Sequence, residues 1–207
     1  MSTVITNDSL RNSPLNDEAL EQTFINARTV NAFTKEPVPD AILTQLYELM
    51  KWGPTSMNSQ PGHFTFIKTN DAKQRLNSTL LAGNKAKSLT APVTVIIASD
   101  TQFYNHLPEQ FPAVPNAKDM FKSNDEFSQI TALRNSSMQG AYLIIAARML
   151  GLDCGPMSGF DNSAVDAEFF PDGRYQSNFL INIGYGDSAG NYPRGPRLSL
   201  EQVTRII

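Results

Sequence analysis

The chain has 207 residues, 41% of them hydrophobic, so it can bury one sizeable core. Its formal net charge is -3 without any run of Lys or Arg, which makes nucleic acid and anionic membranes poor partners. The single cysteine, Cys154, excludes an internal disulfide, and two histidines without metal-ligand spacing lead us to expect no metal site.

The predicted elements alternate between helices and a few strands. Residues 1–15 are polar, and we expect a flexible tail before a single domain over residues 16–207. The predicted elements are a helix from the N-cap Asn16 to Asn26, a helix over 39–51 with Pro39 at N1, a strand at 63–68, helical pieces at 71–81 and 85–89 separated by Gly83, a strand at 92–98, a helix at 126–150, a helix at 162–169 capped by Asp161, and a strand at 178–185. This pattern indicates an α+β fold.

Two regions suggest contacts beyond a simple core. Residues 100–124 hold several aromatic side chains among prolines, and connectors of this length are often lids or binding loops. Residues 142–150 are apolar almost all round their helix, so this helix should lie in the core or across a subunit interface. The exposed faces of this helix and of the helix over 39–51 are not polar enough for a monomer, which favours a homodimer. The longest apolar stretch is far below the roughly 20 residues of a membrane span, and no leader-like pattern opens the chain, so we expect a cytoplasmic protein.

The connector after the second helix is the most informative segment. Pro54 and Pro61 stiffen its ends, and the residues between them are mainly uncharged donors and acceptors. Such a loop suits a flat heteroaromatic ring with N–H and C=O edges, although a stiff surface turn would have the same composition. We expect Trp52, just before the loop, to pack in the core, although its ring could instead line the pocket beside the loop.

Three other segments have ordinary interpretations when each is taken alone. Residues 28–33 (Arg-Thr-Val-Asn-Ala-Phe) could simply follow a helix C-terminus. Residues 155–160 (Gly-Pro-Met-Ser-Gly-Phe) could be a glycine-rich turn, or a place where the backbone approaches a ligand. Arg194 and Arg197 could be solvated surface charges.

Taken together, these segments resemble the nitroreductase family of FMN-dependent oxidoreductases. The resemblance covers residues 27–200, and its most specific stretches resemble the malonic semialdehyde reductase branch, which acts in pyrimidine degradation. Those stretches are residues 51–56, 90–94, 134–139, 155–161 and 180–187. The resemblance implies an α+β sandwich with a central mixed sheet flanked by helices, and an intertwined homodimer with two FMN sites at its interface.

The resemblance also assigns residues to the cofactor. It implies that FMN is bound by Arg28, Thr29, Asn31, Pro54, Thr55, Ser56, Asn58, Asn84, Pro156, Met157, Ser158, Gly159 and Arg197. The loop that begins at Pro54 would reach the flavin held mainly by the other subunit. Lys87 and Arg134 would lie on the substrate or nicotinamide side. No side chain is assigned as catalytic, because the chemistry would take place on the N5 atom of FMN.

The chain departs from the family pattern at four places. Ala27 and Asn31 stand where many members have cations, so phosphate binding would depend on Arg28 and Arg197. Ser158 stands where better-known nitroreductases have a glutamate, and Gly62 replaces an aromatic residue. These departures weaken an expectation of nitroaromatic preference more than the expectation of FMN.

The activity implied is hydride transfer from NADPH or NADH through FMN to a small aldehyde such as malonic semialdehyde, which gives 3-hydroxypropionate by a ping-pong mechanism. Reduction of nitro compounds or quinones is the alternative within the enzyme class. A flavin-binding protein without reductase activity and a helical interaction protein remain alternatives outside it.

Overall fold

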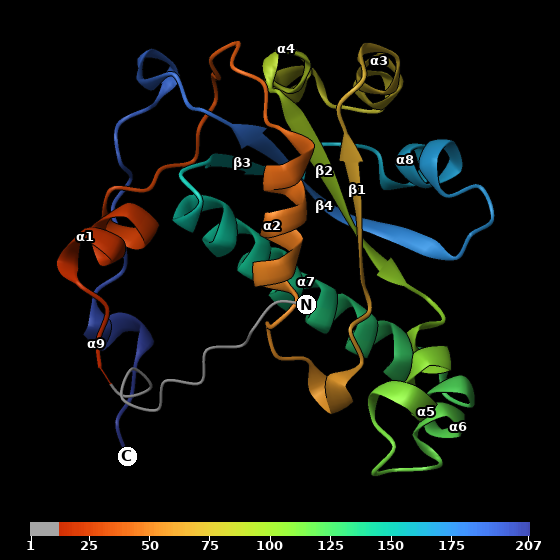
Figure 1. Cartoon of the computed structure of the whole chain (residues 1–207). Helices are drawn as coiled ribbons and strands as arrows, with labels where there is room; N and C mark the ends of the chain where they lie inside the picture. Colours follow the sequence, from red (N-terminus) through yellow and green to blue (C-terminus); the bar gives the residue numbers. More distant parts are fainter. Residues whose placement is uncertain (1–12) are drawn as a thin grey trace. The chain divides into compact units, whose positions relative to one another are not determined.

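A computed structural model describes residues 13–207, and these residues form two compact units. We call the first the helical unit; it consists of residues 13–27, Pro39–Gly62 and Ser99–Leu152. The second, the sheet unit, consists of Arg28–Val38, His63–Ala98 and Asp153–Ile207. Figure 1 labels the helices and strands of both units.

The sheet unit is built on a four-stranded sheet. Its strands are β1 (Gly62–Ile67), β2 (Val93–Asp100), β3 (Asp153–Met157) and β4 (Tyr175–Gly184) in the order β1-β2-β4-β3, the first residue of β1 and the last two of β2 being assigned to the helical unit. β3 and β4 are antiparallel, with Gly155 opposite Asn182. A parallel bridge joins Thr29 to Cys154 of β3. The predicted α+β class is confirmed.

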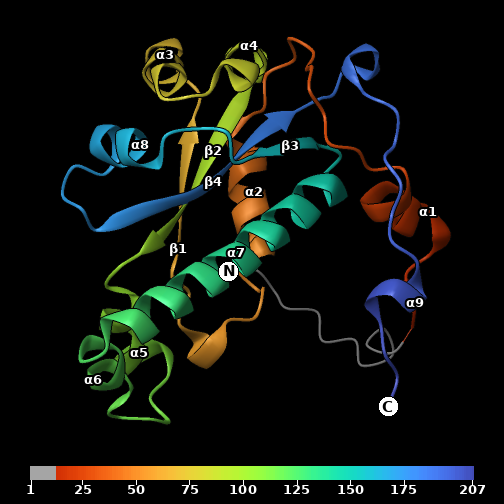
Figure 2. The same ribbon diagram turned by 180° about the vertical axis from the view of Figure 1, so that it is seen from behind.

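Helices and a shared apolar core complete the sheet unit. Its helices are α3 (Asn70–Ser78), α4 (Ala82–Thr90), α8 (Asn162–Phe169) and α9 (Leu200–Val203), with a short 3-10 turn at Ser188–Gly190. Figure 2 shows α3 and α4 together at the end of the sheet where β1 stops and β2 starts. Leu76, Ile96, Val165 and Leu180 belong to one buried cluster, so residues from α3, β2, α8 and β4 share a core. Burying each such side chain contributes roughly 1.5–3 kcal/mol.

The helical unit is organised around its longest helix. Its elements are α1 (Asp17–Leu20), a π-helical turn (Glu21–Ile25), α2 (Asp40–Met50), 3-10 turns at Ser56–Asn58 and Phe103–His106, α5 (Leu107–Gln110), α6 (Ala117–Lys122) and α7 (Asp125–Met149). α2 packs against α7 (Figure 1). Among the described residues, no helix is both long and apolar enough to cross a bilayer.

The 100–124 segment has an apolar cluster of its own. Phe103, Leu107, Ala117 and Phe121 are buried there together with Ala132 of α7. The rings of Phe103 and Phe121 meet edge to face, with centroids 5.0 Å apart, which is a favoured aromatic geometry. The segment is therefore a folded part of the helical unit rather than an irregular connector.

The predicted helix starts agree with the structure where a local side chain determines them. Asn16 accepts a hydrogen bond from the Ala19 backbone N–H, and Asp161 accepts one from that of Ala164, each at 3.0 Å. Pro39 is the N-cap of α2 rather than its first residue. Gly83 lies inside α4 instead of separating two helices.

The largest error of the sequence analysis concerns β3. The stretch around Gly155 and Pro156 looked like a turn, but residues 153–157 form a strand. A proline is tolerated there because β3 is at the edge of the sheet. Residues 1–12 of the predicted tail lie outside the described residues, and the single domain over residues 16–207 stays a prediction.

Gly155 should be sensitive to substitution, whereas Gly83 should not. A Cβ at position 155 would lie 2.5 Å from the Val30 carbonyl oxygen, but at position 83 it would meet nothing within 4 Å. We expect Gly155→Ala to lower the free energy of unfolding by about 1–3 kcal/mol. Gly83→Ala should raise it by about 0.5–1 kcal/mol, because alanine loses less entropy in a helix. Urea unfolding measures both, and equal changes in the two variants would contradict this packing.

Candidate functional site

In the sheet unit, the predicted phosphate-binding segment lies beside β3. The Val30 backbone N–H donates to the Cys154 carbonyl at 3.0 Å, and Thr29 forms its bridge to the same residue. Gly155 allows this approach because it has no Cβ to meet the Val30 carbonyl. Thr29 is exposed at this point, whereas Arg28 and Asn31 are half-buried.

Helix α4 joins this segment to the second predicted flavin segment. Asn84 and Lys87 are one helical turn apart and therefore lie on the same face of α4. Asn84 Nδ2 donates to the Gly159 carbonyl at 2.8 Å, and Lys87 Nζ donates to Asn31 Oδ1 at 3.4 Å. The structure thus brings together three predicted pieces of the site: residues 28–31, 84–87 and 156–159.

Gly159 is glycine because Asn84 occupies the space of a side chain. A Cβ at position 159 would lie 2.5 Å from Asn84 Nδ2. The Leu81 backbone N–H also donates to the Gly159 carbonyl, at 3.0 Å. This double contact fixes the path of the backbone, and next to it Ser158 is exposed and Pro156 is half-buried.

A buried chain of polar side chains lies below this segment. Thr94 Oγ1 donates to Asn182 Oδ1 at 2.7 Å, and Asn182 Nδ2 donates to Ser88 Oγ at 3.3 Å. The Ser88 hydroxyl in turn contacts the sulfur of the buried Met157 at 3.7 Å. Sequence reasoning missed this chain, although an asparagine inside the apolar run of β4 was a signal that it needed buried partners.

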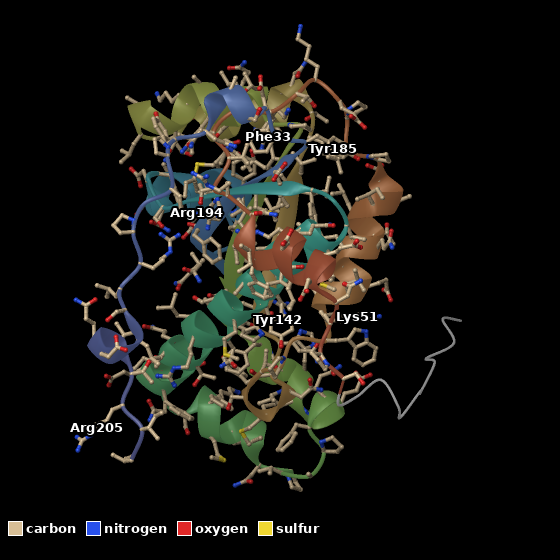
Figure 3. All side chains as sticks on the ribbon, turned by 90° about the vertical axis from the view of Figure 1, so that its left-hand side faces the viewer. Phe33, Lys51, Tyr142, Tyr185, Arg194 and Arg205 are labelled. Carbon is tan, nitrogen blue, oxygen red and sulfur yellow. The ribbon has the colours of Figure 1, made fainter. Side chains whose placement is uncertain are left out.

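The arginines of the predicted phosphate site are held by backbone carbonyls. The Arg28 guanidinium donates to the Tyr192 carbonyl, which ties the 28–31 segment to the tail. Arg197 is exposed and donates to the Gly195 and Pro196 carbonyls, each at 3.1 Å. Figure 3 shows the tail with Arg194 labelled on it. That Arg28 and Arg197 bind one phosphate stays a prediction.

In the helical unit, the Pro54–Pro61 loop has an unusual backbone. Met57, Asn58 and Gln60 have φ angles of 52°, 50° and 43°, all in the left-handed region that glycine prefers. Each such residue costs roughly 1–3 kcal/mol and persists where its surroundings enforce it, which happens most often at functional sites. Pro54, Ser56 and Asn58 are exposed in this loop.

Two buried amides of α7 hold the ends of the loop. The Ser56 backbone N–H donates to Asn135 Oδ1 at 2.8 Å, and the Gly62 backbone N–H donates to Gln139 Oε1 at 2.7 Å. Asn135 is only 2% exposed and Gln139 only 5%. Inside the loop, Thr55 Oγ1 accepts from the Gln60 backbone N–H at 3.2 Å. Within residues 134–139, a role was predicted only for Arg134, which is exposed on α7.

The expectation that Trp52 packs in the core is wrong. Its side chain is 72% exposed, and the Lys51 ammonium lies 5.6 Å from the centroid of its ring. The next residue, Gly53, lies close to the ring of Tyr142 on α7: a Cβ at position 53 would be 2.7 Å from that ring. Figure 3 labels Lys51 and Tyr142 in this unit. Trp52 thus adds to the apolar surface rather than to the core.

Known proteins resemble most of the chain. The family model described as "Nitroreductase family" matches residues 25–185. A protein of Burkholderia lata described as a candidate NADH dehydrogenase/NAD(P)H nitroreductase is 53% identical over 93% of this chain and 98% of its own length. One of Rhodopseudomonas palustris with the same description is 52% identical over 94% of this chain and 99% of its own. A protein of Exiguobacterium sibiricum described as a candidate nitroreductase and solved in complex with FMN superposes with a TM-score of 0.83 at 19% identity over 94% of this chain and 99% of that one.

Lys87 should give the stability a specific pH dependence. Burial lowers the pKa of Lys87 from its usual value, because desolvation penalises the ammonium. Between this lowered pKa and about 10.5, the unfolded chain binds more protons than the folded one, so the free energy of unfolding rises with pH. Lys87→Met should show a smaller rise than the wild type, and urea unfolding from pH 7 to 10.5 measures the difference. Parallel curves for the two proteins would contradict the expectation, since Lys73, whose pKa burial also lowers, is present in both.

Proposed function

Since this chain belongs to the nitroreductase family, we propose that it is an NAD(P)H-dependent FMN oxidoreductase. The observation that carries the proposal is a pair of hydrogen bonds from α4: Asn84 donates to the Gly159 carbonyl, and Lys87 donates to Asn31. These bonds bring together, in one unit, the segments that the family resemblance assigns to the flavin. The descriptions of relatives more than 50% identical support the reductase activity.

The residues present fit FMN. Arg28, Thr29 and Arg197 would hold the phosphate, because guanidinium and hydroxyl groups suit its oxygens. Asn31, Asn84 and the 156–159 segment would face the ring, and Asn84 is already fixed against Gly159 by a hydrogen bond. When bound, FMN supplies hydride chemistry, which takes a hydride from the nicotinamide and gives it to an acceptor. The chain's own residues bind and orient the two partners and exclude water.

The Pro54–Pro61 loop supports the same cofactor. Its uncharged Thr55, Ser56 and Asn58 offer donors and acceptors in a fixed geometry. The buried Ser59 hydroxyl has no hydrogen-bond partner among the described residues, a state that usually reflects a function or a missing partner. We propose that this loop contacts a flavin held mainly by a second copy of the chain.

A homodimer is part of the proposal. The exposed large apolar residues of α2, its C-terminal end and α7 are too many for a helical surface that faces only water. They are Tyr47, Leu49, Trp52, Phe127, Ile130, Leu133, Met138, Tyr142 and Met149. A second copy that covers these residues would remove them from solvent.

For the acceptor, we propose a small aldehyde that carries a carboxylate, such as malonic semialdehyde formed in pyrimidine degradation. Lys87 or Arg134 would hold the carboxylate, and Ser158 would avoid the repulsion that a glutamate at its position would cause. Reduction of nitro compounds or quinones is the second candidate, favoured by the descriptions of the relatives. The anaerobic test below uses both NADH and NADPH, so it also shows which nicotinamide the protein accepts.

Anaerobic mixing of the FMN-loaded protein with NADPH or NADH tests the activity. The proposal expects rapid loss of the yellow flavin absorbance with at least one nicotinamide, followed by its return when an acceptor is added. A protein that binds FMN but is not reduced would be a flavin-binding protein without reductase activity. A protein that takes up no FMN would contradict the proposal altogether.

Two exposed arginines of the tail provide a matched test of phosphate binding. Arg197→Gln should raise the Kd for FMN about 10- to 150-fold, because a charge-assisted hydrogen bond contributes roughly 1.5–3 kcal/mol. Arg205→Gln removes the same charge from the same tail, outside the proposed site, and should leave the Kd nearly unchanged. Quenching of flavin fluorescence measures both values. Equal changes would show that Arg197 acts only through the general charge.

Arg134 distinguishes the acceptors. If Arg134 holds the substrate carboxylate, Arg134→Gln should raise KM for malonic semialdehyde about tenfold or more, the loss of one charged contact. KM for a neutral quinone should not change. Steady-state assays of both acceptors decide the matter, and equal effects on the two would refute this role.

A further inference from the structure

The strained middle of the Pro54–Pro61 loop is in contact with the 100–124 segment. Met57, the first left-handed residue, packs against the buried cluster that contains Phe103 and Phe121. Tyr104, Phe111 and Val114 pack against the same cluster. The side chain of Met57 is therefore retained by an aromatic core that belongs to a different part of the sequence.

The other two left-handed residues contact one residue of that segment, Gln110 at the end of α5. Asn58 Nδ2 donates to the Gln110 carbonyl at 3.1 Å, and Gln60 Nε2 donates to Gln110 Oε1 at 3.1 Å. Gln60 Nε2 also donates to Asn58 Oδ1 at 3.0 Å. Three amides thus form a closed network in which Gln110 serves as an acceptor through both its backbone and its side chain.

This network has a different task from the amides of α7. Asn135 and Gln139 hold Ser56 and Gly62, where the backbone needs no unfavourable φ angle. Gln110 holds Asn58 and Gln60, which both adopt the unfavourable left-handed conformation. A strained conformation persists only if neighbouring contacts outweigh its cost. The contacts that stabilise the middle of the loop include those of the 100–124 segment.

We propose that Gln110 is a positioning residue that holds the Pro54–Pro61 loop in its flavin-binding conformation. The proposal rests on the proposed function, because it takes the flavin as the loop's ligand. It assigns the 100–124 segment the role of preorganising the loop before the cofactor binds. A preorganised loop binds its ligand more tightly because it loses less conformational entropy on binding.

Substitutions at position 110 distinguish the role of Gln110 Oε1 as a hydrogen-bond acceptor from the packing of its side chain. Gln110→Met keeps the length of the side chain but removes Oε1, whereas Gln110→Glu keeps an acceptor oxygen for Gln60. Glu109→Met makes the same kind of change at the exposed neighbouring residue and serves as the control. All variants are full-length chains, measured with and without FMN.

Hydrogen exchange of the apoprotein reports the loop without any cofactor. We expect Gln110→Met to speed exchange of the amides of residues 57–60, while Gln110→Glu and Glu109→Met exchange like the wild type. The melting temperature of the apoprotein should be similar in all four proteins. Unchanged exchange in Gln110→Met, or equal acceleration in Gln110→Glu, would overturn the positioning role of Gln110, regardless of how tightly the variants bind FMN.

The Kd for FMN then tests the link to the cofactor. Gln110→Met should raise it about tenfold, the effect of losing one or two hydrogen bonds that preorganise the loop. Gln110→Glu should restore most of the affinity, and Glu109→Met should not alter it. Faster exchange with an unchanged Kd would overturn the positioning role but leave the proposed function intact. Failure of the wild type to bind FMN would overturn both.

Discussion

The carbonyl oxygen of Gly159 accepts two hydrogen bonds from the start of α4, and the proposed site depends on this contact. The Leu81 backbone N–H and the Asn84 side chain donate to it at 3.0 Å and 2.8 Å. One turn further along α4, Lys87 reaches Asn31. A short helix thereby fixes two segments separated by more than one hundred residues, and a side chain at position 159 would break the arrangement.

Local strain and long-range anchors together shape the second part of the site. The Pro54–Pro61 loop has three residues in the left-handed conformation, which Met57 and Gln60 in particular would rarely adopt without support. Gln110 of α5 and an aromatic cluster compensate for this cost, while amides of α7 hold the two ends of the loop. Rigidity of this kind suits a planar cofactor, because the loop need not rearrange when the ring binds.

The sequence predicted those features that depend on neighbouring residues. Asn16 and Asp161 each cap the helix that follows by accepting a hydrogen bond from the backbone N–H three residues ahead. Their roles are therefore visible in the sequence itself. Strand β3 was missed because its residues resemble a turn, and only its pairing with β4 makes it a strand. Gln110 and Asn135 were missed for the same reason, since their partners in the loop lie 50 to 79 positions away. The family resemblance supplied the site residues, but it could not supply the contacts that hold them.

A crystal structure of the protein grown with FMN would show where the cofactor binds. We expect electron density for one flavin per chain, in contact with the 156–159 segment and Asn84, with its phosphate at Arg28. Flavin density elsewhere on the protein, or a phosphate remote from Arg28, would contradict this expectation.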